Sequence, residues 1–208
     1  MIVKVCGMRL AENIREVEAA GADWLGLIFF PRSPRFVTDK PAYLPSKAKR
    51  VGVFVNACEN EIMEKAKTFG LNLVQLHGQE PPELCERLHA EGLEVIKVFS
   101  LKSVHDLQSV SAYEGKADFF LFDTPCLEFG GSGKVFDWTL LQSYSGSTPF
   151  LLSGGLRPES LDALLTFSHP RWVGIDLNSG FELAPGLKDT ASLAAFIQTF
   201  KVSLHESH

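Results

Sequence analysis

Residues 73–99 read LVQLHGQEPPELCERLHAEGLEVIKVF, and this stretch indicates the fold. Leu73–Leu76 and Val95–Phe99 are short runs of mainly apolar residues, typical of parallel strands that are covered on both faces. Between them, Pro81 favours the start of a helix, and Gly92 lies where a helix would end. A strand, a helix and a second strand in this order predict a βαβ unit with parallel strands.

The same pattern recurs along the whole chain. Eight runs are candidate strands: Ile2–Cys6, Trp24–Phe30, Val51–Val55, Leu73–Leu76, Val95–Phe99, Phe119–Phe122, Phe150–Leu152 and Trp172–Ile175. The units recur about every 25 residues, and eight of them need about 200 residues, the lower end of the range for a closed barrel. We therefore expect an α/β protein with one (β/α)8 TIM barrel of eight parallel strands over residues 1–202, followed by a short C-terminal tail, 203–208.

An open, doubly wound sheet is the alternative, because it also alternates strands and helices. However, the first strand leads into Cys6-Gly7-Met8-Arg9, which is not a glycine-rich dinucleotide fingerprint. Gly130-Gly131-Ser132-Gly133-Lys134 is similar to a P-loop, but Glu128 replaces its first glycine and Val135 replaces the serine or threonine that binds magnesium. A nucleotide site is therefore not expected.

Composition and charge exclude several classes of protein. The 208 residues are 45% hydrophobic and 22% charged, and the net charge of −5 argues against binding to nucleic acid or to an acidic membrane. No apolar run reaches about 18 residues, and Met1–Met8 lacks the features of a secretory signal. We expect a cytoplasmic protein that binds a small molecule. The oligomeric state stays open, with a monomer favoured over a homodimer.

Cysteine spacing gives no sign of a metal site. Cys6, Cys58, Cys85 and Cys126 are far apart and form no C-x-x-C pair. Zinc and redox motifs are therefore not indicated, and free thiols in a reducing compartment fit best.

In a parallel barrel, functional groups lie where the strands end and in the loops that follow. Gly154-Gly155 follows the seventh strand and Ser179-Gly180 the eighth, where such barrels commonly bind phosphate. Bare backbone N–H groups next to glycine, near the start of a helix, are well suited to an anion. The alternative is that each glycine only serves a turn.

Cys6 and Asp123 end the first and sixth strands, so they are expected at the same rim of the barrel. Together they offer one base and one acid. A lone strand cysteine is otherwise usually a small buried apolar residue, and an aspartate at a strand end usually caps a turn. The unperturbed pKa values of about 8.5 and about 3.9 mean that both groups need tuning, Cys6 by positive surroundings and Asp123 by desolvation.

Four further polar residues follow strands. Arg35, with Arg32, lies on the loop after the second strand, and its guanidinium is either a carboxylate clamp or a solvated loop residue. His77 is either a proton carrier or a structural residue that lines the site. Asp176 either orients a substrate N–H or caps the turn before Ser179.

Taken together, the motifs resemble the phosphoribosylanthranilate isomerase family from one end of the chain to the other. The matching segments, in the family's order, are Lys4–Arg9, Phe30–Val37, Gln75–Gly78, Phe122–Thr124, Gly130–Trp138, Leu152–Leu156, Ser179–Glu182 and Gly186–Asp189. Singly these motifs are weak, but the ordered set is specific. Ser153 and Asn178 depart from the family's commonest residues, which affects only details of phosphate binding.

The resemblance implies a role for each site residue. Cys6 would be the general base and Asp123 the general acid, while Arg35 would bind the anthranilate carboxylate. The phosphate would be held by Gly154, Gly155, Ser179 and Gly180. Asp176 would lie near the anthranilate nitrogen, and His77 would help to orient the substrate.

The implied reaction is an Amadori rearrangement in tryptophan biosynthesis, with an anionic sugar phosphate as substrate and without metal or organic cofactor. Another phosphosugar barrel is the alternative enzyme, because phosphate loops are shared between such folds. An indole-glycerol-phosphate synthase is disfavoured by the short chain, and a histidine-pathway isomerase by Cys6, where aspartate is expected. A non-catalytic phosphate-binding scaffold is the alternative from another class, disfavoured by the presence of both Cys6 and Asp123.

Overall fold

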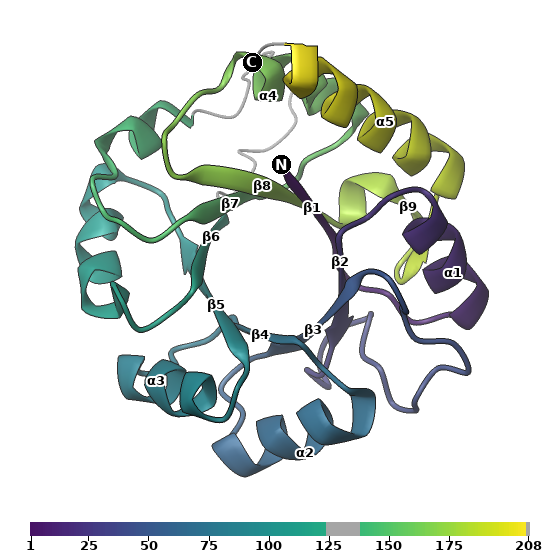
Figure 1. The fold of residues 1–208 in the computed structure, drawn as a ribbon, viewed down its shortest axis with the longest axis horizontal. Coiled ribbons are helices and arrows are strands. Elements are labelled where there is room, and N and C mark those ends of the chain that lie inside the picture. The colour runs from purple at the N-terminus through teal and green to yellow at the C-terminus, as the bar shows by residue number, and fades with distance from the viewer. Residues whose placement is uncertain (124–137, 207–208) are drawn as a thin grey trace.

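A computed structural model of the chain describes residues 1–123 and 138–206. Eight parallel strands pair in chain order and close into a barrel (Figure 1). The strands are β1 (Ile2–Val5), β2 (Trp24–Ile28), β3 (Lys49–Phe54), β4 (Leu73–Leu76), β5 (Glu94–Ser100), β6 (Phe119–Asp123), β7 (Phe150–Ser153) and β8 (Trp172–Leu177). Closure occurs between β1 and β8, where Ile2–Val5 pair with Gly174–Leu177. The prediction of a closed TIM barrel is confirmed, and the open sheet is excluded.

Helices cover the outside of the barrel (Figure 1). The α-helices are α1 (Ala11–Ala19), α2 (Glu59–Phe69), α3 (Pro82–Ala90), α4 (Leu161–Thr166) and α5 (Thr190–Glu206), and the 3₁₀ helices are η1 (Val104–Tyr113), η2 (Trp138–Ser143), η3 (Pro158–Ser160) and η4 (Ser179–Phe181). Proline begins α3 as expected, and Gly70 ends α2 in the left-handed region at φ 58°. Helix α5 includes residues 203–206 of the expected tail.

The connection between β2 and β3 differs from a regular barrel unit, because residues 29–48 contain no helix. The segment holds four prolines, Pro31, Pro34, Pro41 and Pro45, which lack the backbone N–H that a helix interior requires. An isolated bridge between Ile28 and Phe36 ties its first part to the barrel. This loop carries Arg35.

The side chains inside the barrel are apolar near the strand beginnings and include polar groups nearer the strand ends. Alternate strand residues point inward, and one buried cluster near the strand beginnings is apolar: Trp24, Val51, Leu73, Ile96, Val98, Leu121 and Leu151. Nearer the strand ends, buried polar side chains appear, among them Lys4, Gln75 and Asp176. Because buried polar groups are costly without partners, this end is the place to look for a site.

Two sequence features lie outside the described residues: Cys126 and the glycine-rich Gly130–Lys134 segment. Within residues 1–123 and 138–206, no helix combines the length and the apolar character needed to cross a bilayer. Beyond β8, a short antiparallel hairpin of β9 (Glu182–Ala184) and β10 (Leu187–Lys188) precedes α5.

Candidate active site

Cys6 follows β1 at the carboxyl end of the barrel, and its side chain is only 3% exposed. Its thiol occupies space that Gly26 of β2 leaves open, since a Cβ at Gly26 would lie 2.8 Å from Cys6 Sγ. Lys4 lies two residues earlier, within β1, so its side chain points into the barrel on the same side as the thiol. Cys6 therefore lies nearer the rim of the barrel than the buried side chain of Lys4.

Lys4 is paired with Asp176. Their Nζ and Oδ1 atoms are 2.8 Å apart, both side chains are almost fully buried, and the two residues are direct partners in the β1–β8 register. Burial opposes the charge on Lys4, but Asp176 and Cys6 outweigh it and raise the lysine pKa. Asp176 is thus held as an ion-paired carboxylate beneath the rim rather than as a cap of the following turn.

The electrostatic environment of Cys6 has two opposing parts. Burial raises the pKa of the thiol, whereas the charges of Lys4 and Lys188 lower it and that of Asp176 raises it. The net direction is upward, so burial favours the neutral thiol over the thiolate in the ligand-free protein. The positive surroundings that the sequence led us to expect are present, supplied by lysines, but they do not overcome desolvation.

Asp123 ends β6, and His77 follows β4 at the same rim. His77 Nε2 lies 3.9 Å from Asp123 Oδ2, and Gln75 Nε2 lies 3.4 Å from His77 Nδ1. Burial raises the pKa of Asp123, with His77 opposing the shift, and burial also lowers the pKa of His77. Desolvation therefore favours the protonated carboxyl, as an acid requires.

Arg35 reaches across to the segment after β8. Its Nε lies 2.9 Å from Glu182 Oε1, and its Nη2 also donates to the same carboxylate. Glu182 accepts a further bond from Lys188 Nζ at 2.7 Å, and its side chain is 5% exposed. Burial alone would raise the pKa of Glu182, but the bonds from Arg35 and Lys188 lower it to about 2. Arg32, in contrast, is exposed.

The two glycine loops meet at the same rim. Gly154 and Gly155 have φ values of 102° and 61°, which glycine adopts without strain. A Cβ at Gly180 would lie 2.0 Å from the carbonyl oxygen of Leu156, so the loop after β8 packs directly against the loop after β7. Ser179 begins the short helix η4. The structure therefore brings the four predicted phosphate-binding residues into adjoining loops.

Sequence reasoning missed Lys4, Glu182 and Lys188. A signal for Lys4 was present: it precedes Cys6 by two residues on a predicted strand, which places both on one face. Glu182 and Lys188 belong to the matching segments Ser179–Glu182 and Gly186–Asp189, but nothing local showed that they are buried, since a charged residue outside a strand or helix is normally solvated.

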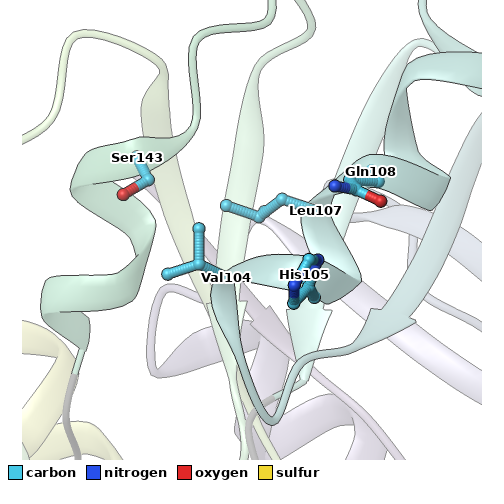
Figure 2. A pocket seen from close by; sticks show the side chains of 5 residues that line it. All are labelled: Val104, His105, Leu107, Gln108 and Ser143. Atoms are coloured by element: carbon cyan, nitrogen blue, oxygen red, sulfur yellow. The ribbon is translucent and has the colours of Figure 1, made fainter.

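A separate cavity of about 380 Å³ is lined by Val104, His105, Leu107, Gln108 and Ser143, from helix η1 and the end of η2 (Figure 2). None of the predicted site residues lines it, and among the described residues His105 is its one titratable side chain. It is not part of the candidate active site.

Comparisons with known proteins show which family the chain resembles. A family profile described as N-(5'phosphoribosyl)anthranilate (PRA) isomerase matches residues 3–199. The chain is 60% identical to the N-(5'-phosphoribosyl)anthranilate isomerase of Phocaeicola vulgatus, covering 97% of this chain and 98% of the relative. It is 53% identical to that of Parabacteroides distasonis, covering 95% and 92%.

Solved structures agree as well. The phosphoribosyl anthranilate isomerase of Thermotoga maritima is 38% identical with a TM-score of 0.85, over 97% of this chain and all of that one. The chain therefore belongs to the N-(5'-phosphoribosyl)anthranilate isomerase family.

Proposed function

We propose that this chain converts N-(5-phosphoribosyl)anthranilate into 1-(2-carboxyphenylamino)-1-deoxyribulose 5-phosphate, a step of tryptophan biosynthesis in the cytoplasm. The observation that carries the proposal is the arrangement at one barrel rim of Cys6, Asp123, Arg35 and the two glycine loops. A similar solved isomerase, 35% identical with a TM-score of 0.83 over 97% of this chain and 100% of that one, holds reduced 1-(O-carboxyphenylamino)-1-deoxyribulose 5-phosphate. That ligand has the carboxylate and phosphate for which these groups are suited.

The chemistry requires one acid and one base. Asp123 donates a proton to the furanose ring oxygen, the C1–O bond breaks, and the substrate nitrogen supplies the electrons to form an iminium ion. That cation acidifies the proton on C2, which the Cys6 thiolate removes to give an enolamine. Tautomerisation then yields the ketone. Because the substrate nitrogen is the electron sink, this aldose–ketose isomerisation, of the intramolecular oxidoreductase type, needs no cofactor.

The positive charge of the iminium ion also helps the base. In the ligand-free protein, burial raises the Cys6 pKa. A cation formed next to the thiol favours its thiolate, so ring opening and proton removal support each other. We expect Asp176, which is paired with Lys4, to accept a hydrogen bond from the anthranilate nitrogen, and His77, next to Asp123, to help orient the substrate.

The phosphate site gives the first testable prediction. A phosphate or sulfate ion soaked into crystals should lie against the backbone of Gly154, Gly155, Ser179 and Gly180, because these loops present N–H groups beside glycines. Difference density at saturating anion measures its position. An ion bound elsewhere, with these loops vacant, would contradict the assignment.

Arg35 gives the second prediction. Arg35→Ala should raise KM roughly tenfold or more while changing kcat little, because the substrate carboxylate keeps its charge throughout the reaction and is bound about equally in ground and transition states. Steady-state kinetics on the folded variant measure both constants, and Arg32→Ala, which removes an exposed arginine from the same loop, is the matched control. An unchanged KM in Arg35→Ala would remove the clamp from the mechanism.

One coupled assay tests the function as a whole. Anthranilate, phosphoribosyl pyrophosphate and the upstream transferase generate the labile substrate, and the isomerase then consumes it. Turnover by this chain supports the proposal, whereas binding without turnover favours the non-catalytic phosphate-binding scaffold. We further propose that the chain acts as a monomer, and analytical ultracentrifugation distinguishes this from a homodimer.

A further inference from the structure

The contacts of Arg35 leave one edge of its guanidinium available. Nε and Nη2 both donate to Glu182, which occupies the side-on edge of the group. Among the described residues, Nη1 has no hydrogen-bond partner. A guanidinium carries five N–H donors in a rigid plane, so its end-on edge, formed by Nη1 and the second N–H of Nη2, can still receive a carboxylate at two points.

Glu182 is itself firmly held. Lys188 Nζ lies 2.7 Å from Glu182 Oε1, and the backbone N of Gly186 lies 3.0 Å from the same oxygen. Lys188 Nζ also donates to Asn178 Oδ1 at 2.8 Å, and the backbone of Lys188 is bound on both sides by the Asn13 amide of α1. The carboxylate that contacts Arg35 is therefore anchored to β10, α1 and the end of β8.

The charges of this cluster favour an anionic ligand. Arg35 and Lys188 are cations and Glu182 is an anion, so the three together carry one positive charge. Without Glu182, two cations would face each other and Arg35 would be free to turn into solvent. Glu182 thus holds the guanidinium in place without cancelling the attraction for a carboxylate.

We propose that Glu182 is a positioning residue, which fixes the guanidinium plane of Arg35 so that its end-on edge receives the anthranilate carboxylate. This inference rests on the proposed function, in which Arg35 binds that carboxylate. A merely structural tie between the β2 loop and the β9–β10 hairpin would predict lost stability instead, without a selective effect on carboxylate binding.

The test is a double-mutant cycle on the full chain. Glu182→Gln should raise KM roughly fivefold to tenfold with kcat changed less than about twofold, because the lost charge loosens Arg35 but leaves the reacting groups in place. In an Arg35→Ala background, Glu182→Gln should add nothing to KM, because Glu182 acts through the guanidinium. Additive effects of the two substitutions would overturn the proposal.

Two controls separate positioning from general damage. Glu114→Gln alters another partly buried carboxylate, bound to Tyr144, Ser147 and Thr148 away from the rim, and should leave KM unchanged. The inhibition constant of inorganic phosphate should stay within about twofold in Glu182→Gln, since the glycine loops keep their backbone. A parallel loss of phosphate affinity would show that Glu182 acts on the phosphate loop and would contradict the inference.

The outcomes also distinguish this inference from the proposed function. If Arg35→Ala leaves KM unchanged, the clamp itself is wrong. If Arg35→Ala raises KM and Glu182→Gln does not, only the positioning role is wrong. Should Glu182→Gln fail to fold, Glu182→Asp retains the charge on a shorter side chain, and the same rise in KM is expected because the carboxylate no longer reaches Arg35.

Discussion

Replacing Cys6 by alanine is expected to lower kcat by about 100-fold or more, the usual scale for a positioned base, with KM nearly unchanged. Cys6 is placed to remove the C2 proton, and it contacts neither of the anionic ends of the substrate in the proposed mechanism. Its thiol lies at the carboxyl end of β1 in space left open by Gly26. Steady-state kinetics on a variant with wild-type circular dichroism measure the effect, and a near-normal kcat would overturn the mechanism.

The other cysteines provide matched controls for this result. Cys58 is exposed at the start of α2, and Cys85 of α3 is buried in the hydrophobic core, and neither has a role in the proposed mechanism. Cys58→Ser and Cys85→Ala should each retain kcat, and Cys126→Ser should do the same. Because Cys6 is buried and its pKa is raised, a small thiol-directed reagent should inactivate the wild type faster as pH rises, with saturating product protecting it, and should not further affect Cys6→Ala.

Asp123→Asn is the second large effect, with kcat lower by about 100-fold or more, because an amide cannot protonate the ring oxygen. Burial raises the Asp123 pKa, which favours the protonated form that the mechanism requires. KM should change little, since Asp123 is not proposed to bind either anionic group. Asp118→Asn, which changes a carboxylate paired with His89 just before β6, is the control and should leave kcat unchanged.

The pH profile of the wild type follows from the same pair. The reactive form carries one proton on the pair, with Asp123 protonated and Cys6 ionised. An ordinary thiol has a higher pKa than a carboxyl, so the more populated singly protonated form has the proton on Cys6. The fraction of the pair that carries one proton decreases when the pH is below the carboxyl pKa and when the pH is above the thiol pKa. The dependence of kcat/KM on pH is therefore bell-shaped.

Burial raises both pKa values in the free protein, so both limbs are expected at higher pH than for unperturbed groups. In Asp123→Asn only the thiol remains to titrate, and the residual rate should rise with pH to a plateau. Rates measured with constant ionic strength across the range test both statements. A residual rate in Asp123→Asn that falls as pH rises would exclude Cys6 thiolate as the base.

The sequence by itself determined the barrel and the positions at its rim. Short apolar runs such as Phe119–Phe122 mark strands because burial on both faces demands continuous hydrophobicity, and this is a local property. Strand ends follow directly, so Cys6, Asp123 and the glycine pair Gly154-Gly155 were predicted with their loops. The four prolines between β2 and β3 also explain why no helix forms there, although the sequence analysis did not predict the absence of this helix.

The tertiary structure alone decided which charges meet. Lys4 and Asp176 are 172 residues apart in the chain, and only closure of β8 onto β1 makes them register partners. Arg35 and Glu182 are 147 residues apart and meet because the β2 loop folds over the end of β8. Local propensity contains no information about such pairs, since the free energy of a buried ion pair depends on distance and desolvation, which exist only once the barrel has closed.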